Sequence, residues 1–405
     1  MLDHELELRF CKARRAAIAH DFYKMNEQQK QAVLATEGPL LLLAGAGSGK
    51  TTVLINRIAN LMKYGRGSDS VEVPEWVTAE DVAFLEGYAA APDARGQERA
   101  QRLCQLEPAS PWSILAITFT NKAAGELKER LERMLGPAAN EIWASTFHSA
   151  CVRILRRDIE KLGFSSSFTI YDTDDSLRVI KDILKENNID DKQFPPRTVL
   201  GYISRAKDEM KLGAEYLAQC RRSGDFRKEK IAQIYAEYER RLWEASALDF
   251  DDIILHTVRL LQQDEQVRTY YQRKFRYVLI DEYQDTNNLQ YLLASTLAGG
   301  YENFCVVGDD DQSIYRFRGA TIENILSFEQ QYKNARVIRL EQNYRSTGNI
   351  LNAANAVIRN NQGRKGKELW TKAGAGDKLQ LYTAMNENDE AQYVAMRILD
   401  DYSKG

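Results

Sequence analysis

The sequence predicts an α/β protein that is built on a parallel sheet and carries an inserted all-helical subdomain. Short apolar segments alternate with helical stretches, which is typical of a parallel sheet with helices on both faces. Between His148 and Arg276 the sequence changes to long charged segments with helical periodicity and no convincing strand, so this part is the predicted subdomain. The predicted strands are residues 40–43, 114–118, 277–281, 304–308 and 337–340.

Two segments lie outside this scheme. Residues 1–24 form an N-terminal extension, and residues 65–111 are interrupted by prolines and begin with GRGSDS, as a surface insertion does. Thr78 and Asp81 have the spacing of a capping box and predict a short helix pair within the insertion. Because no catalytic residue type gathers there, we expect a tolerated loop elaboration. Elsewhere, the clearest helical periodicity lies at residues 174–186, 228–244 and 387–402.

The composition is that of an ordinary globular protein. The chain has 405 residues, of which 44% are apolar and 28% charged, enough for two or three domains. No apolar run is long enough to span a membrane and the N-terminus is charged, so we expect a cytoplasmic protein without a membrane partner. The cysteines are odd in number and never paired as CxxC, which argues against a disulfide framework and a zinc site.

The segment PLLLLAGAGSGKTT predicts a phosphate-binding loop between a buried strand and a helix. Its Lys50 is suited to reach the outer phosphates and its Thr51 to hold Mg²⁺. A glycine-rich turn without chemical function would not need this Lys-Thr pair. The first position is Ala44 instead of glycine, which Gly45 and Gly47 make sterically acceptable. The candidate nucleotide-binding residues are Ala44, Gly45, Ala46, Gly47, Ser48, Gly49, Lys50, Thr51 and Thr52.

Two carboxylates follow the predicted strand in the segment YVLIDEYQ. Asp281 is suited to hold Mg²⁺ through water, and Glu282 to orient and deprotonate an attacking water. Acidic pairs are common at strand ends, so this pair alone would mean little. Together with the phosphate loop, at the edge where ligands bind in open α/β sheets, it indicates a nucleotide hydrolase.

The segment VVGDDDQSIYRFRGA also follows a predicted strand. Gln312 is a candidate sensor of the γ-phosphate. Tyr315, Phe317 and Arg318 combine rings with a cation, which suits the stacking of unpaired bases. Phe119 and His148 lie among hydroxyl residues at two other strand ends, although any single aromatic residue is more often part of the core.

Taken in order, these motifs resemble those of the UvrD/PcrA/Rep family of superfamily 1 DNA helicases. They read LAGAGSGKT, ITFTNKAA, STFHS, LDFDD, LIDEYQDTN, VGDDDQSIYRFRGA and LEQNYRST. The resemblance implies a RecA-like fold for the first ATP-binding domain. Its two parts would be residues 25–150 and 276–348, with the helical subdomain at 151–275 and the beginning of a second RecA-like domain at 349–405.

The resemblance also implies roles for single residues. Gln29 would read the adenine edge, Tyr344 would stack on the adenine, and Arg345 would touch the γ-phosphate. With them, the implied catalytic residues are Lys50, Asp281, Glu282, Gln312 and Arg345. Phe317 replaces a tryptophan that is usual in the family, so stacking there should survive but weaken. The implied DNA-binding residues are Thr118, Phe119, Asn121, Thr146, His148, Tyr315, Phe317 and Arg318.

The activity implied by the resemblance is ATP-dependent 3′–5′ unwinding of DNA in repair or replication restart. ATP and Mg²⁺ would be the cofactors, and single-stranded DNA and single-strand/duplex junctions the partners. Family members complete the site with a second RecA-like domain that supplies an arginine worth roughly a thousandfold or more in rate. Only the beginning of that domain is predicted here, so we expect a fragment that binds ATP·Mg²⁺ but turns it over poorly.

Two other functions fit the same motifs. The chain could be the helicase part of a helicase-nuclease, because a nuclease carboxylate cluster would lie beyond these motifs. It could also be an ATP-binding switch without enzymatic activity. Binding of single-stranded DNA would favour the helicase over the switch.

Overall fold

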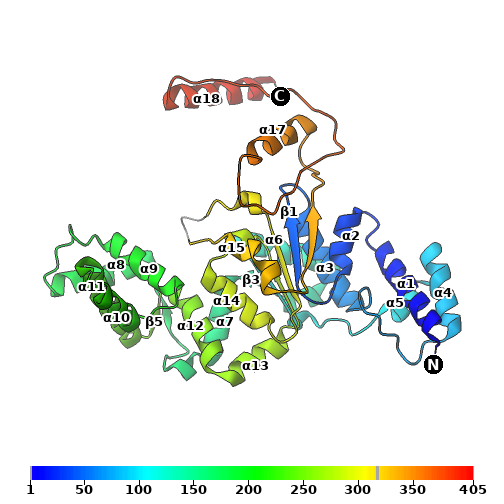
Figure 1. Ribbon diagram of the computed structural model, residues 1–405, viewed down its shortest axis with the longest axis horizontal. Helices are drawn as coiled ribbons and strands as arrows, with labels where there is room; N and C mark the ends of the chain where they lie inside the picture. The colour runs from blue at the N-terminus through cyan, green and yellow to red at the C-terminus, as the bar shows by residue number, and fades with distance from the viewer. Residues whose placement is uncertain (1, 316–318, 405) are drawn as a thin grey trace.

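The computed structural model describes residues 2–315 and 319–404, and its centre is a six-stranded sheet (Figure 1). The strand order is β3-β2-β6-β7-β1-β8, and every neighbouring pair is parallel. This confirms the predicted α/β class. The strands are β1 (Leu40–Ala44), β2 (Ile114–Thr118), β3 (Trp143–Thr146), β6 (Tyr277–Ile280), β7 (Phe304–Gly308) and β8 (Arg336–Leu340). Of these, β3 is absent from the predicted strand ranges, although His148 was expected to follow a strand.

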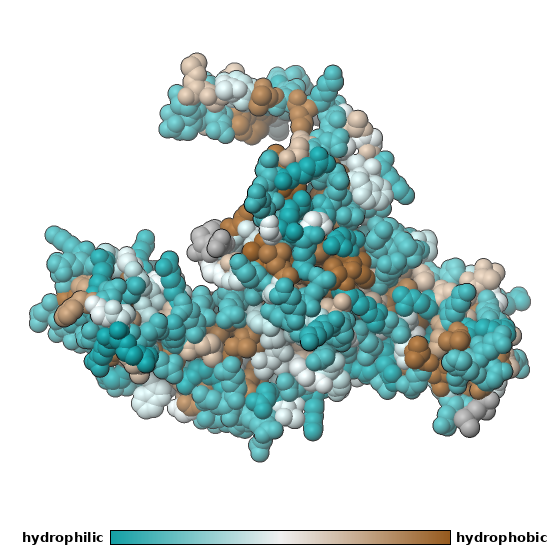
Figure 2. All heavy atoms as spheres, in the orientation of Figure 1, coloured by the Kyte–Doolittle hydropathy of each residue, from teal (hydrophilic) through white to brown (hydrophobic). Residues whose placement is uncertain are grey.

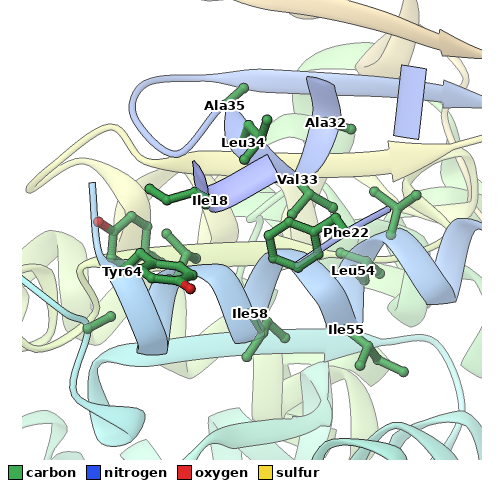
Figure 3. Close-up of a cluster of buried hydrophobic side chains, with 14 of the residues drawn as sticks. Ile18, Phe22, Ala32, Val33, Leu34, Ala35, Leu54, Ile55, Ile58 and Tyr64 are labelled. Atoms are coloured by element: carbon green, nitrogen blue, oxygen red, sulfur yellow. The ribbon is translucent and has the colours of Figure 1, made fainter. Parts of the chain in front are cut away.

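Both faces of the sheet are buried, which explains why its central strands are continuously apolar. In β1, Leu40 and Leu42 belong to one core cluster, whereas Leu41 and Leu43 belong to the other. Helices α2 (Glu27–Leu34), α3 (Lys50–Tyr64) and α6 (Asn121–Leu135) cover the first face. Figure 3 shows part of this cluster, in which Phe22 is seen between Val33 of α2 and the α3 side chains Leu54 and Ile58.

The second face is covered by helices from the two ends of the predicted subdomain and from the chain that follows it. These helices are α7 (Phe147–Asp158), α12 (Phe250–Gln263), α13 (Glu265–Lys274), α14 (Asn288–Ala298), α15 (Glu323–Leu326) and α16 (Phe328–Gln331). Helices α12 and α13, although inside the predicted range 151–275, therefore pack on the sheet. The domain boundaries stay a prediction.

A third core cluster belongs to the helical unit that projects from the sheet domain in Figure 1. The helical unit consists of four helices and two strands of two residues each. These are α8 (Thr173–Glu186), α9 (Pro196–Asp208), α10 (Gly213–Ser223), α11 (Phe226–Glu244), β4 (Thr169–Ile170) and β5 (Ala247–Leu248). Two predicted helices, 174–186 and 228–244, are confirmed as α8 and α11. Buried Lys207 joins the unit to α12 through ion pairs with Asp249 and Asp252, at 2.6 and 2.7 Å.

The N-terminal extension and the insertion fold together. Helix α1 (His4–His20) packs against α4 (Ala79–Ala90) and α5 (Gln97–Cys104), at the side of the sheet domain opposite the helical unit (Figure 1). The predicted capping box of Thr78 and Asp81 is present at the start of α4. The insertion is thus more than the expected loop elaboration, since Val82 and Leu85 share a core cluster with Phe10 of α1.

The C-terminal part of the chain lies above β1 and β8 in the view of Figure 1. It contains α17 (Gly348–Ile358) and α18 (Glu387–Lys404), the second of which confirms the predicted helix 387–402. Every residue of α18 is exposed or half-exposed. In the view of Figure 2 the surface of the molecule is largely hydrophilic, with hydrophobic patches at the centre and on the C-terminal helix. Across residues 2–315 and 319–404, we find no helix with the length and apolar character that a membrane span requires.

Arg14 of the N-terminal extension forms hydrogen bonds with the insertion, and these bonds predict a contribution to stability. Its guanidinium is buried and donates to the carbonyl oxygens of Ser70 and Glu72 at 2.6 and 2.9 Å. Arg14→Leu should lower the free energy of unfolding by about 2 to 3 kcal/mol, because both acceptors lose a charged donor. Urea denaturation measures this change. An equal loss for Lys12→Leu, at an exposed position of α1, would contradict the assignment.

Candidate functional site

A glycine-rich loop joins the end of β1 to the start of α3 and forms the predicted phosphate cradle. Gly47 (φ +67°) and Gly49 (φ +84°) adopt left-handed backbone conformations, which glycine reaches without strain. Ser48 closes the turn, because its hydroxyl donates to the Gly45 carbonyl oxygen at 2.7 Å. Gly49 is the N-cap of α3 and has no side chain to bond the first N–H groups of the helix. Those groups suit an anion.

Lys50 begins α3 and forms an ion pair with Glu282, with 2.8 Å between Nζ and Oε2. Glu282 has a φ of +50°, a conformation that costs a non-glycine residue about 1 to 3 kcal/mol and that clusters at functional sites. Burial and the neighbouring Glu282 raise the pKa of Asp281 to about 6. The charges of the protein therefore compensate Asp281 only in part, which is an environment suited to a bound divalent cation.

Gln312 lies in a short 3-10 helix after β7 and reaches this cluster through two other side chains. Its Nε2 donates to the Asp309 carboxylate. The Asp309 N–H donates to Gln284 Oε1 at 2.9 Å, and Gln284 Nε2 donates to Glu282 Oε2 at 2.9 Å. These bonds form one network across the carboxyl ends of β6 and β7. The structure thus brings Gln312, Glu282 and Lys50 into one site.

The segment after β8 closes on the phosphate loop. Asn343 Nδ2 donates to the Ala46 carbonyl oxygen at 2.7 Å, and the Tyr344 N–H donates to that of Gly47 at 2.9 Å. A Cβ built on Gly47 would lie 2.9 Å from the Cβ of Arg345. Only glycine allows this approach, which brings the backbone of Arg345 next to the loop.

The two predicted adenine-binding residues are linked through Asn26. Gln29 is buried. Its side-chain Oε1 accepts a hydrogen bond from the Asn26 N–H, and its Nε2 donates to the Ser48 carbonyl oxygen at 2.9 Å. Asn26 Nδ2 donates to the Tyr344 hydroxyl at 2.8 Å. The ring of Tyr344 is 56% exposed and is open to stacking. In this state Gln29 supports the phosphate loop, and its contact with an adenine stays a prediction.

The remaining nucleotide candidates occupy the ends of β1 and α3. Ala44 is the buried last residue of β1. Thr51, the predicted Mg²⁺ ligand, is half-buried in the first turn of α3. The Thr52 hydroxyl accepts a hydrogen bond from Arg130 of α6 at 3.2 Å. Their contacts with a nucleotide stay predictions.

Two pairs of rings line the carboxyl ends of the neighbouring strands. Phe119, after β2, stacks on Tyr315, with ring centroids 6.1 Å apart. His148, in the first turn of α7, meets Phe250 of α12 edge to face at 5.6 Å. Burial lowers the pKa of His148, which favours its neutral form. The other two predicted base-contacting residues, Phe317 and Arg318, lie outside the described residues.

The predicted hydroxyl contacts have mainly local partners. Thr118 is buried, and its hydroxyl donates to the Thr120 carbonyl oxygen at 3.2 Å. Thr146 is buried and caps α7 by accepting the Ser149 N–H. Asn121 is exposed in the first turn of α6. The two threonines therefore shape the strand ends, whereas Asn121 is open to a ligand.

Sequence reasoning missed several residues that build the site. Gln284, Asp309 and Asn343 hold its parts together, and Phe250 extends the aromatic surface with 51% of its area exposed. All four lie inside motifs that the sequence analysis had noted. Their motif membership was the available signal, but their partners depend on the register of the sheet.

Comparison with known proteins identifies the family. A model of the UvrD/REP helicase N-terminal domain matches residues 25–71 and 97–333, and one of the UvrD-like helicase C-terminal domain matches residues 338–404. The first model therefore leaves out α1 and α4.

Curated relatives agree with these models. Over 381 residues the chain is 49% identical to the ATP-dependent DNA helicases PcrA of Bacillus subtilis and Staphylococcus epidermidis, and 48% identical to that of Staphylococcus aureus. Each comparison covers 94% of this chain and 46% of the relative, so the chain spans about half of their length. These matches show that the chain belongs to the UvrD-like helicase family.

Proposed function

We propose that the protein is an ATP-dependent DNA helicase that hydrolyses ATP to move along single-stranded DNA in the 3′ to 5′ direction. It opens DNA at single-strand/duplex junctions during repair or replication. The observation that carries the proposal is the network from Lys50 through Glu282, Gln284 and Asp309 to Gln312. The polarity is supported by family resemblance alone.

The site suits a triphosphate and an attacking water. The loop N–H groups bind the phosphates, Lys50 and Arg345 bind the outer phosphate oxygens, and Glu282 accepts the proton of the water. Lys50 and Glu282 neutralise each other at 2.8 Å in this structure. A triphosphate competes for Lys50 by its greater charge, and the freed Glu282 carboxylate can then act as a base. Gln29 and Tyr344 bind the adenine.

The donor set also fits Mg²⁺. Asp281 is a half-buried carboxylate whose pKa is raised to about 6, and Thr51 offers a hydroxyl at the start of α3. Hard oxygen ligands of this kind, completed by phosphate oxygens, are those that Mg²⁺ prefers. When bound, Mg²⁺ neutralises charge on the phosphates.

The aromatic pairs suit unpaired bases. Phe119 follows β2 and Tyr315 follows β7, the two strands that neighbour β6 and its carboxylates. Phe250 adds an exposed ring beside His148. Stacking on rings tolerates any base sequence, as a motor on DNA requires. The nucleotide network and the stacking surface meet at Gln312 and Tyr315, which are three residues apart in the chain.

Glu282→Gln should separate binding from hydrolysis. We expect an affinity for ATP similar to that of the unsubstituted protein and single-turnover hydrolysis slower by about a hundredfold or more, because the base is lost. Lys50→Ala is the contrasting variant and should lose nucleotide affinity, with Lys128→Ala of α6 as the exposed control. Unchanged hydrolysis in Glu282→Gln would show that another group activates the water.

Phe119→Ala should weaken binding of a labelled single-stranded oligonucleotide by about fivefold to a hundredfold, the loss expected for one stacked base. Fluorescence anisotropy over a range of salt concentrations measures this. Tyr23→Ala is the control, because Tyr23 is exposed and lies beyond α1. Failure of the unsubstituted protein to bind DNA even at low salt would favour an ATP-dependent switch instead.

The polarity can be measured with two tailed duplexes. Because the chain spans about half the length of its curated relatives, the assay uses a protein of their full length. We expect that protein to separate a duplex with a 3′ single-stranded tail when ATP is present and to separate the same duplex with a 5′ tail only weakly, since a 3′–5′ motor approaches the junction only from a 3′ tail. A gel assay of strand displacement reports both. Preference for the 5′ tail would refute the polarity and leave the ATP site unaffected.

A further inference from the structure

A buried lysine from the C-terminal part of the chain lies among three consecutive aspartates at the end of β7. Lys367 Nζ is 2.6 Å from Asp309, 2.8 Å from Asp311, and also pairs with Asp310. Only 2% of its side chain is exposed. Burial opposes its charge, but the aspartates raise the pKa of Lys367 above its ordinary value. The ammonium therefore compensates a carboxylate cluster that would otherwise repel itself.

Two neighbours of Lys367 fix the same segment. Arg364 pairs with Asp311 through two bonds of 2.7 and 2.8 Å, and it donates to the Lys367 carbonyl oxygen at 2.8 Å. The Lys365 N–H donates to Asp310 at 2.7 Å. A segment that the C-terminal family model covers is thus bound to the end of a strand in the N-terminal model.

This contact extends to the candidate catalytic groups. Asp309 uses Oδ1 for Lys367 and Oδ2 for the Nε2 of Gln312. A glutamine amide has two N–H donors at one end and an acceptor at the other, so this bond fixes which end of Gln312 faces which way. The Asp309 N–H continues the network through Gln284 to Glu282.

We propose that Lys367 is a positioning residue that holds Asp309, and through it Gln312 and Glu282, in the arrangement needed for ATP hydrolysis. The inference rests on the proposed ATPase function and adds a regulation of that site. Withdrawal of the C-terminal segment removes the ammonium, leaves three carboxylates facing one another, and releases Asp309. The position of this segment thereby controls the orientation of the hydrolytic groups.

The test uses Lys367→Gln, with Arg359→Gln as the control. Arg359 precedes Lys367 by eight residues, and the ion pair of its side chain with Glu368 is exposed. In Lys367→Gln we expect kcat to fall about tenfold to a hundredfold while the Kd of a fluorescent ATP analogue stays within about threefold. Arg359→Gln should leave both unchanged, and Lys367→Arg should recover part of kcat.

A charge-balanced variant separates positioning from folding. Lys367→Gln combined with Asp310→Asn restores the net charge of the cluster but not the anchor of Asp309, so kcat should stay low although thermal stability recovers. Recovery of kcat in this double variant, or an unchanged kcat in Lys367→Gln, would overturn the inference.

Hydrogen exchange distinguishes failure of the inference from failure of the proposed function. If the unsubstituted protein binds ATP but never hydrolyses it, the proposed function fails. Amide exchange at residues 309–312 then tests whether Lys367 anchors this segment. Faster exchange there in Lys367→Gln than in Arg359→Gln supports the anchor, and equal exchange refutes it.

Discussion

The parallel direction of the six strands is the constraint on which the site depends. Because every strand runs the same way, all of their carboxyl ends open on one edge, and residues distant in sequence meet there. The phosphate loop follows β1, the carboxylates follow β6, and Gln312 follows β7. An antiparallel partner in any of these positions would move its motif to the opposite edge and separate the base from the phosphates.

Close backbone packing is the second requirement, and it explains the glycines of the loop. A Cβ built on Gly45 would lie 2.1 Å from Leu369, and one on Gly47 would lie 2.6 Å from Asn343. The loop therefore contacts two segments of the C-terminal part of the chain. Replacing glycine here would push those segments away from the phosphates, so the glycines serve the contact with the C-terminal part as well as the fit to a nucleotide.

The sequence predicted most of the sheet and the parts of the site, but not how the parts connect. Strands such as β1 and β7 are apolar throughout because they are buried on both faces, and this pattern is readable. The edge strand β3 is short and contains Ser145 and Thr146, so no such pattern marks it. The Gln284–Asp309 bond requires the register that pairs Val278 with Phe304, which emerges only on folding. The contact between Lys367 and Asp309 joins residues that lie still farther apart in the sequence.

Burial gives the Lys367 cluster a character that suits control better than stability. Buried ion pairs add little net stability, because desolvation of the charges offsets their attraction. They do fix orientation strongly, since an uncompensated charge in the same place is costly. The side chain of Arg364, 17% exposed, pairs with Asp311 nearer the surface, and Lys367 lies deeper. Separation of the two segments would expose Arg364 to water at small cost but would leave Asp309 and Asp310 without their buried cation. A modest movement of the C-terminal segment is therefore converted into a large electrostatic change beside Gln312.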